Sequence, residues 1–287
     1  KQKNPLQEMI FLIDYHIHPN YSLDAEGTLA EFCQAAVKKD ISEIAFTTHV
    51  DTDPATEDCF VIVSGEKVNV HSGYWLEDYE TSVLRVADEY QEKGLIVRLG
   101  AEIDLYSDVA GNLPDNFYDV DFDLIIGSVH LIDHVAISTK EGAKEIFSRY
   151  SPRGLADIYF PLLLDALDEH LIDIVGHLDI YRRYGSKYYG EKIDSIWEPY
   201  LDELVNKMKS QNLGFEINTS TWRKGLAQPM PDTKIVEQLV ESGVDVVTTG
   251  SDAHHPADVG YGMCKAEEML QSLGVNNPAR FDSRNAL

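Results

Sequence analysis

The chain has 287 residues, enough for one large α/β domain or two small ones. Its 24 basic and 49 acidic residues give a formal net charge of −25, which argues against nucleic-acid binding through phosphate neutralisation. No apolar stretch approaches the roughly 20 residues of a membrane helix, no signal peptide is evident, and three dispersed cysteines suit reduced cytosolic thiols, so we expect a cytoplasmic chain without a membrane partner.

Seven apolar, β-rich runs alternate with helical stretches along the chain. Strands are expected near 10–16, 43–49, 95–102, 123–130, 172–177, 212–218 and 244–250. Helices are expected near 28–39, 77–93, 153–170, 194–211, 233–242 and 264–272. Residues 1–9 are interpreted as an N-terminal leader, and residues 50–76 as a long loop, typical of a lid or specificity loop.

The alternation of strands and helices predicts right-handed βαβ units and a parallel sheet. We expect residues 10–287 to form one α/β domain, a closed, slightly irregular barrel with one strand fewer than the usual eight. An open doubly wound sheet is the alternative. It is disfavoured because no Gly-rich dinucleotide fingerprint follows the first strand.

Each of the seven runs ends in polar or ionisable residues. Parallel strands would place these side chains at one end of the sheet, where barrel enzymes gather their active sites. The ligand-type residues at six of these strand ends are His16, His18, His49, Glu102, His130, His177, Asp252 and His254. Burying so many ionisable groups together without cations would be very costly, so the pattern predicts a multinuclear metal site.

Two of these strand ends carry residue pairs at i and i+2. His16 and His18 on the first strand would face the same side, and Asp252 and His254 repeat this spacing after the last strand. The two pairs become neighbours if the barrel closes. Asp14, two residues before His16, is placed to orient an imidazole from behind.

The donor set also indicates the kind of metal and the chemistry. Imidazoles and carboxylates without cysteine suit divalent Zn, Mn or Fe. Two or three such ions can hold a bridging hydroxide as nucleophile, clamp a phosphoryl group and stabilise a leaving alkoxide. Open coordination positions favour catalysis over a closed structural site.

These residues, in this order, resemble the PHP (polymerase and histidinol phosphatase) superfamily. The family pattern of H-x-H, a further His, a bridging Glu, two more His and a final D-x-H appears as His16, His18, His49, Glu102, His130, His177, Asp252 and His254. A ninth family ligand lies six residues after H-x-H, where this chain has Asp24 and some members have His. The resemblance covers nearly the whole chain.

Within the superfamily the chain is similar to the histidinol-phosphatase branch, through segments such as Gly127–His130, Val175–Asp179 and Gly250–His254. The resemblance implies a distorted (β/α)7 TIM-like barrel with three divalent ions. By that resemblance His16, His18, Glu102 and Asp252 hold the first ion. Glu102 bridges to the second, held with His130 and His177, and Asp24, His49 and His254 hold the third.

Two pairs of cations follow strand ends in this very acidic chain. They are Arg182–Arg183 and Arg223–Lys224. Because a guanidinium can bind a phosphate through two hydrogen bonds, we expect Arg183 and Arg223 to bind the substrate, with Arg182 and Lys224 as weaker candidates.

The function expected is hydrolysis of L-histidinol phosphate to L-histidinol and phosphate, a step of histidine biosynthesis. Asp252 or His254 is expected to assist protonation of the departing alkoxide. One alternative is a PHP-type phosphoesterase acting on nucleotides, phosphodiesters or phosphotyrosine. Another is a metal-binding accessory module without activity. The partner expected is a small phosphorylated substrate, with the chain as a monomer or small homo-oligomer.

Overall fold

The computed structural model describes residues 12–167 and 170–287. The leader expected at residues 1–9 lies outside the described residues, as do the first two residues of the expected first strand. Among the described residues, none of the helices combines the length and apolar character that crossing a bilayer demands.

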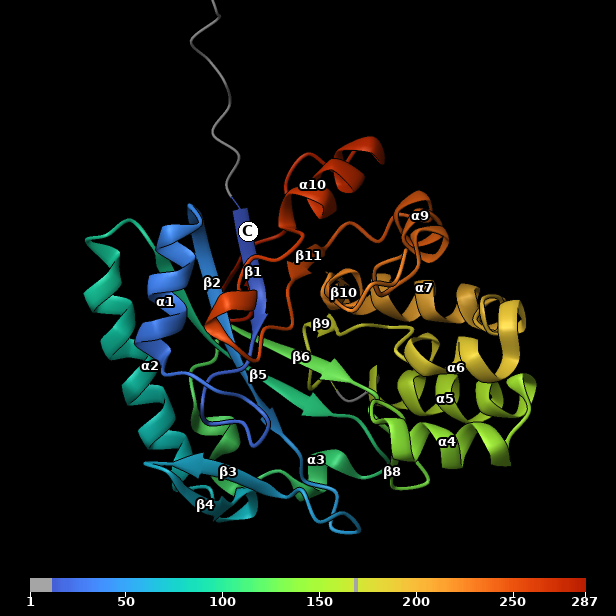
Figure 1. Ribbon diagram of the computed structural model, residues 1–287, viewed down its shortest axis with the longest axis horizontal. Helices are drawn as coiled ribbons and strands as arrows, with labels where there is room; N and C mark the ends of the chain where they lie inside the picture. The colour runs from blue at the N-terminus through green and yellow to red at the C-terminus, as the bar shows by residue number, and fades with distance from the viewer. Residues whose placement is uncertain (1–11, 168–169) are drawn as a thin grey trace, which may run out of the picture.

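Seven parallel strands form the central sheet, in the order β1-β2-β5-β6-β9-β10-β11 (Figure 1). Their bounds are Leu12–Ile17 (β1), Ile41–Val50 (β2), Ile96–Asp104 (β5), Leu124–Ser128 (β6), Ile174–Val175 (β9), Gly214–Asn218 (β10) and Val247–Gly250 (β11). All seven lie where the sequence predicted strands. Several are shorter than expected: β6 and β9 stop before the polar residues that follow, and β10 and β11 begin later than expected.

The first and last strands meet, which nearly closes the sheet into a barrel. Ile17 and Ala253 form a parallel bridge, and the His18 amide donates to the Ala253 carbonyl at 2.9 Å. Below this bridge, the Asp14 carboxylate accepts hydrogen bonds from the amide and hydroxyl of Ser251 at 2.8 and 2.6 Å. The barrel prediction is therefore confirmed, and the open doubly wound sheet is not formed.

Helices surround the barrel, with α1 and α2 beside β2 and β5 and the group α4 to α7 on the opposite side (Figure 1). The helices are Leu29–Lys38 (α1), Trp75–Gln91 (α2), Val109–Asn112 (α3), Lys140–Arg149 (α4), Pro152–Leu167 (α5), Arg182–Tyr189 (α6), Leu201–Gln211 (α7), Ser220–Arg223 (α8), Thr233–Glu241 (α9) and Met263–Ser272 (α10). A capping box begins α1: the Thr28 hydroxyl accepts from the Glu31 amide, and the Glu31 carboxylate accepts from the Thr28 amide.

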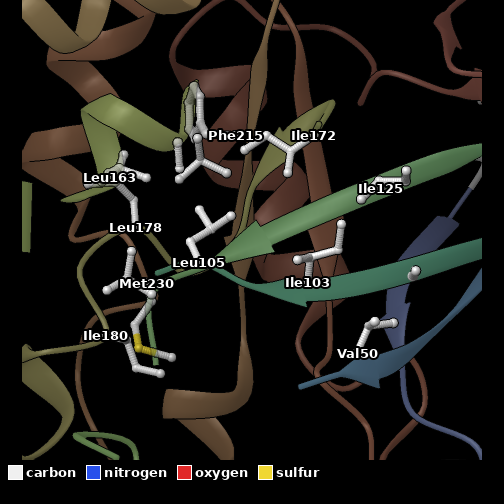
Figure 2. Close-up of a cluster of buried hydrophobic side chains, with 14 of the residues drawn as sticks. Val50, Ile103, Leu105, Ile125, Leu163, Ile172, Leu178, Ile180, Phe215 and Met230 are labelled. Carbon is white, nitrogen blue, oxygen red and sulfur yellow. The ribbon is translucent and has the colours of Figure 1, made fainter. Parts of the chain in front are cut away.

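Apolar side chains fill both faces of the strands. Figure 2 shows part of one cluster on the face that packs against helices, in which Leu105 and Ile172 lie between Ile103 and Ile125 on one side and Leu163 of α5 on the other. A separate cluster joins β1, β2, β6 and β9 around Phe281. Ala45 of this second cluster lies four residues before His49 on β2, and so shares its face. The cluster thus forms an apolar floor inside the barrel, away from the strand ends.

The C-terminal segment covers that floor with a two-stranded hairpin, Phe281–Asp282 (β12) and Asn285–Ala286 (β13). The buried Glu43 carboxylate accepts from Tyr15 Oη and from Arg280 Nε, both at 2.5 Å, and from Arg98 Nε at 2.7 Å. These contacts close the N-terminal end of the barrel, so that access is from the end where the strands finish.

The loops contain more structure than the sequence predicted. Residues 50–76 hold an antiparallel hairpin, Phe60–Val63 (β3) and Glu66–Asn69 (β4), and a 3-10 turn at Val70–Ser72. A second hairpin, Leu131–Ile132 (β7) and Val135–Ala136 (β8), follows β6. Helices α4 and α6, neither of which was predicted, lie between β6 and β10. Short local hydrogen-bonded elements of this kind leave little periodicity to detect.

Candidate active site

The side chains predicted to hold metal converge at the carboxyl ends of the strands. His16 lies in β1, His49 in β2 and Glu102 in β5, where His49 and Glu102 are register partners. The rest follow strand ends by one to four residues: His18 follows β1, His130 follows β6, His177 follows β9, and Asp252 and His254 follow β11. A bulge in β1 between Asp14 and Ile17 lets its last residues turn into the site.

Glu102 lies at the centre of this cluster, with 1% of its surface exposed. Its Oε2 atom is 3.0 Å from His49 Nδ1, 3.3 Å from His16 Nε2 and 3.5 Å from His18 Nε2. Its Oε1 atom is 3.2 Å from His177 Nε2 and 3.6 Å from His130 Nε2. One carboxylate therefore faces five imidazoles, with a different subset on each oxygen, as a bridging ligand would.

The remaining predicted ligands surround His18. Asp252 Oδ1 is 3.5 Å from His18 Nε2, and the His18 ring stacks on His49 and packs against His254, with centroids 4.0 and 4.3 Å apart. Asp24 Oδ2 is 3.2 Å from His254 Nε2, and its Oδ1 is 3.8 Å from His49 Nε2. Asp24, the position that varies in the resemblance, thus reaches the same cluster from a loop.

Several buried donor atoms of this cluster have no hydrogen-bond partner within residues 12–167 and 170–287. They are His16 Nε2, both ring nitrogens of His18, His49 Nδ1, His177 Nδ1 and Glu102 Oε2. Buried polar atoms are normally satisfied, and an orphaned one is costly. Among these atoms, His16 Nε2, His18 Nε2 and His49 Nδ1 lie 3.3, 3.5 and 3.0 Å from Glu102 Oε2 without forming hydrogen bonds, as expected if all four atoms point at shared space. A divalent cation in that space would satisfy both.

Four groups of ligand atoms within 4.8 Å of one another identify where cations would fit. They are His16–Glu102–His177, His16–His18–Asp252, His18–His49–His254 and His49–Asp51–His130. The donors are nitrogen and carboxylate oxygen, which suit Zn, Mn or Fe. These residues fit a multinuclear centre. The partition expected among three ions stays a prediction, since the groups share His16, His18 and His49.

The pKa shifts in the cluster favour, for most of its residues, the protonation states that bind metal. Burial raises the pKa of Glu102, but the histidines around it outweigh burial and hold that pKa well below its usual range. Burial lowers the pKa of His18, and it lowers the pKa of His130 to about 3. Ionised carboxylates and neutral imidazoles are the forms that bind metal. The exceptions are His16 and His49. Against the effect of burial, Glu216 and then Glu102 raise the pKa of His16, and Glu102 raises the pKa of His49. A proton on either ring supplies positive charge that a bound cation would otherwise supply.

The cluster forms the floor of a cavity of about 540 Å³. Among the residues that line it are the ligands Asp24, His49, Glu102, His130, His177, Asp252 and His254. Asp252 and His254, expected to assist the leaving group, lie in its wall, 3.4 Å apart between Oδ1 and Nδ1. The volume suits a small phosphorylated molecule rather than a polymer.

Three of the four predicted phosphate-binding cations line this cavity: Arg183, Arg223 and Lys224. Arg223 is held by the backbone carbonyls of Ser251 and Asp252, at 2.9 and 3.0 Å, and by Asp258 Oδ2 at 3.3 Å. The buried Nε of Arg183 has no hydrogen-bond partner among the described residues. These residues place three cationic side chains in the wall of the cavity that contains the ligand cluster.

The expectation that Arg182 binds phosphate needs correction. Arg182 is not among the cavity-lining residues. Its guanidinium forms ion pairs with Asp179 at 2.9 Å, Asp232 at 2.9 Å and Asp194 at 3.3 Å. With three carboxylates already bound, it ties the turn after β9 to the α9 N-terminus instead of serving a ligand.

The position behind His16, expected for Asp14, is occupied by Glu216. Asp14 binds Ser251 and the Gly260 amide, whereas His16 Nδ1 lies 2.8 Å from Glu216 Oε2. Sequence reasoning also missed Asp51, which lines the cavity and whose pKa is raised to about 6 by burial. Its signal was present: Asp51 follows His49 at the same i, i+2 spacing as the recognised pairs.

Comparisons with known proteins agree with this geometry. The family model for the PHP domain matches residues 14–220. A probable histidinol-phosphatase from Deinococcus radiodurans is 29% identical over 93% of this chain and 95% of the relative, and one from Clostridium acetobutylicum is 26% identical over 96% and 98%.

Among solved structures, the fold matches a histidinol phosphate phosphatase from Lactococcus lactis subsp. lactis Il1403 with a TM-score of 0.75 at 20% identity. The match covers 96% of this chain and 99% of that one. That enzyme was crystallised with zinc, L-histidinol and phosphate. At this identity the likeness establishes the barrel fold.

Proposed function

Because this chain belongs to the PHP domain family, we propose that it is a metal-dependent phosphomonoesterase that hydrolyses L-histidinol phosphate to L-histidinol and phosphate. One observation carries the proposal: a carboxylate facing five imidazoles forms the floor of a small cavity whose wall contains three cations. Relatives named for this activity align over more than 90% of the chain, which supports the choice of substrate.

Three divalent ions, with Zn, Fe or Mn as candidates, would be held by His16, His18, Asp24, His49, Glu102, His130, His177, Asp252 and His254. When bound, such ions supply Lewis-acid stabilisation of phosphate charge and acidify water near neutral pH. Their positive charge also explains how so acidic a chain accepts an anionic substrate.

The chain's own residues then bind and orient the phosphate. Arg183, Arg223 and Lys224 are proposed to contact its oxygens, because all three line the cavity and charge-assisted hydrogen bonds to phosphate are strong. Arg223 is already oriented by Asp258 and by the carbonyls beside Asp252, so little side-chain entropy is lost on binding. Asp252 and His254, adjacent in the cavity wall, are proposed to assist proton transfer to the leaving oxygen.

A kinetic screen of phosphate esters tests the substrate. With the metal-reconstituted protein, kcat/KM for L-histidinol phosphate should exceed that for nucleotides, phosphotyrosine and p-nitrophenyl phosphate by roughly 100-fold or more. Faster hydrolysis of another ester would contradict the substrate proposed here but would leave the proposed metal site unaffected. Bound metal without hydrolysis of any ester would overturn the assignment as an enzyme.

A crystal soaked with phosphate tests the binding residues. The expected result is a tetrahedral anion at the cluster in contact with Arg183 or Arg223. An anion elsewhere in the cavity would remove their assigned roles.

We further propose a cytoplasmic setting and a monomer or small homo-oligomer. The free cysteines Cys33, Cys59 and Cys264 support a reducing compartment. Light scattering of the purified chain tests the size of the assembly.

A further inference from the structure

Glu216, on β10, occupies an unusual position beneath the ligand cluster. Its carboxylate is buried, with 1% exposed surface, and lies behind His16 on the side opposite Glu102. Glu216 Oε2 is 2.8 Å from His16 Nδ1, while His16 Nε2 lies 3.3 Å from Glu102 Oε2. The imidazole is therefore held between two carboxylates, one at each ring nitrogen.

The second oxygen of Glu216 fixes the position of the first. Glu216 Oε1 accepts from the His177 amide at 2.7 Å and from Asn218 Nδ2 at 3.0 Å. Asn218 is itself held, since its Oδ1 accepts from the Ser220 amide and hydroxyl. One side chain of β10 thus fixes the ring of a ligand on β1 and the backbone of a ligand after β9.

Two glycines leave room for this arrangement. A Cβ atom at Gly250 would lie 2.6 Å from Glu216 Oε2 and 2.5 Å from His16 Cβ. At Gly176, which precedes His177, it would lie 2.2 Å from Ser128 Oγ, the hydroxyl bonded to Glu102. Side chains at these positions would displace the carboxylate, its imidazole or the hydroxyl that holds Glu102.

We infer that Glu216 is a positioning residue for the proposed metal centre: it accepts a hydrogen bond from His16 Nδ1, which leaves Nε2 as the metal-binding nitrogen, and it positions the backbone that presents His177. A carboxylate can only accept, so it selects the Nδ1–H form of the ring. Outer partners of this kind typically change metal affinity about 10- to 100-fold when lost. The inference rests on the proposed function, since it requires the metal centre.

Glu43 provides a matched control. It is a second glutamate on a barrel strand, also 1% exposed and also bonded through both oxygens, but it lies at the opposite end of the barrel. Glu216→Gln and Glu43→Gln each replace a buried carboxylate by an amide of the same size. Only the first touches residues of the ligand cluster.

The experiment measures zinc affinity of the metal-free proteins by chelator competition, together with their unfolding midpoints. We expect Glu216→Gln to weaken binding of at least one ion about 10- to 100-fold, and Glu43→Gln to retain wild-type affinity although it lowers the midpoint. Wild-type affinity in Glu216→Gln, or an equal loss in both variants, would overturn the inference. If the wild-type chain itself binds no zinc, the proposed function fails with it.

Glu216→Asp serves if the glutamine variant does not fold. It keeps the charge but withdraws the carboxylate by one methylene, so it cannot reach His16 and the His177 amide together. Weakened zinc binding is again expected, against unchanged binding in Glu43→Asp. Full affinity in Glu216→Asp would show that the charge alone matters and would contradict a positioning role.

Discussion

Ser128 and Glu102 are joined across neighbouring strands by a hydrogen bond of 2.5 Å from the serine hydroxyl to Glu102 Oε1, with both side chains buried. The bond fixes the rotation of the central carboxylate, whose Oε2 atom faces His16, His18 and His49. Ser128→Ala should therefore lower kcat/KM about 10-fold, the value of roughly one charge-assisted hydrogen bond. Ser148→Ala, at an exposed serine on α4, is the control. Unchanged kinetics in Ser128→Ala would exclude this role.

Substitutions of the neighbouring residues Arg182 and Arg183 should have different effects, one on stability and the other on phosphate binding. Arg183→Ala should raise the inhibition constant for phosphate about 10- to 100-fold, because it removes a cation from the cavity wall. Arg182→Ala should instead destabilise the fold by roughly 2 to 4 kcal/mol, because the buried Asp179 carboxylate loses its partner. Inhibition assays and denaturant titrations measure the two effects. The reverse pattern would exchange the assigned roles.

Lys224 should make phosphate binding sensitive to alkaline pH. Desolvation, reinforced by Arg183 and Arg223, lowers the pKa of Lys224 to about 8. The ammonium is charged below that pH and loses its charge as pH rises through it. We therefore expect an alkaline limb in the pH profile, along which kcat/KM falls above about pH 8. Lys224→Met should remove the limb and lower kcat/KM at pH 7. If the alkaline fall in kcat/KM persists in Lys224→Met, it arises from another titrating group.

Glu267 on α10 should make stability fall as pH rises. Burial raises its pKa from 4.5 to about 7, so between these values the folded chain keeps a proton that the unfolded chain has released. Stability is lost over that window. Glu267→Gln should stabilise the protein at pH 8 by roughly 1 to 2 kcal/mol, less than the full shift because the group is partly solvated.

Denaturant titrations at pH 5 and pH 8 test this prediction, with Glu268→Gln at the exposed neighbouring position as control. The Glu267 variant should gain stability at pH 8 and little at pH 5. Equal gains in both variants would point to net charge instead of burial.

The barrel and the cluster could be predicted from sequence because they depend on repeated local signals. Each apolar run gave a strand, and ligand-type residues such as His49 and Glu102 followed from the rule that parallel strands end on one side. A resemblance to a family with known ligands added Asp24, which lies in a loop outside any strand. Its contacts with His49 and His254 could not come from strand periodicity.

What the sequence could not provide were partners chosen by the folded surroundings. Arg182 and Arg183 are adjacent and chemically identical, yet only Arg183 lines the cavity. Arg182 is bound by three carboxylates: Asp179 three residues before it, Asp194 twelve residues after it, and Asp232 fifty residues after it. The sequence pointed to Asp14 as the partner of an imidazole, whereas Glu216 is the residue that lies against His16. Asp14 is engaged elsewhere because β1 closes against the segment after β11, where the amide and hydroxyl of Ser251 donate hydrogen bonds to the Asp14 carboxylate. Such choices depend on contacts between residues 200 or more positions apart in the chain.

The metal-to-protein ratio tests the central claim most directly. It should be measured by elemental analysis of chain purified from cells supplied with zinc, iron and manganese, without chelators. We expect a ratio near three for the wild-type chain and a clear loss in Glu102→Gln, which removes the charge shared by five imidazoles. A ratio near zero in the wild-type chain would contradict it.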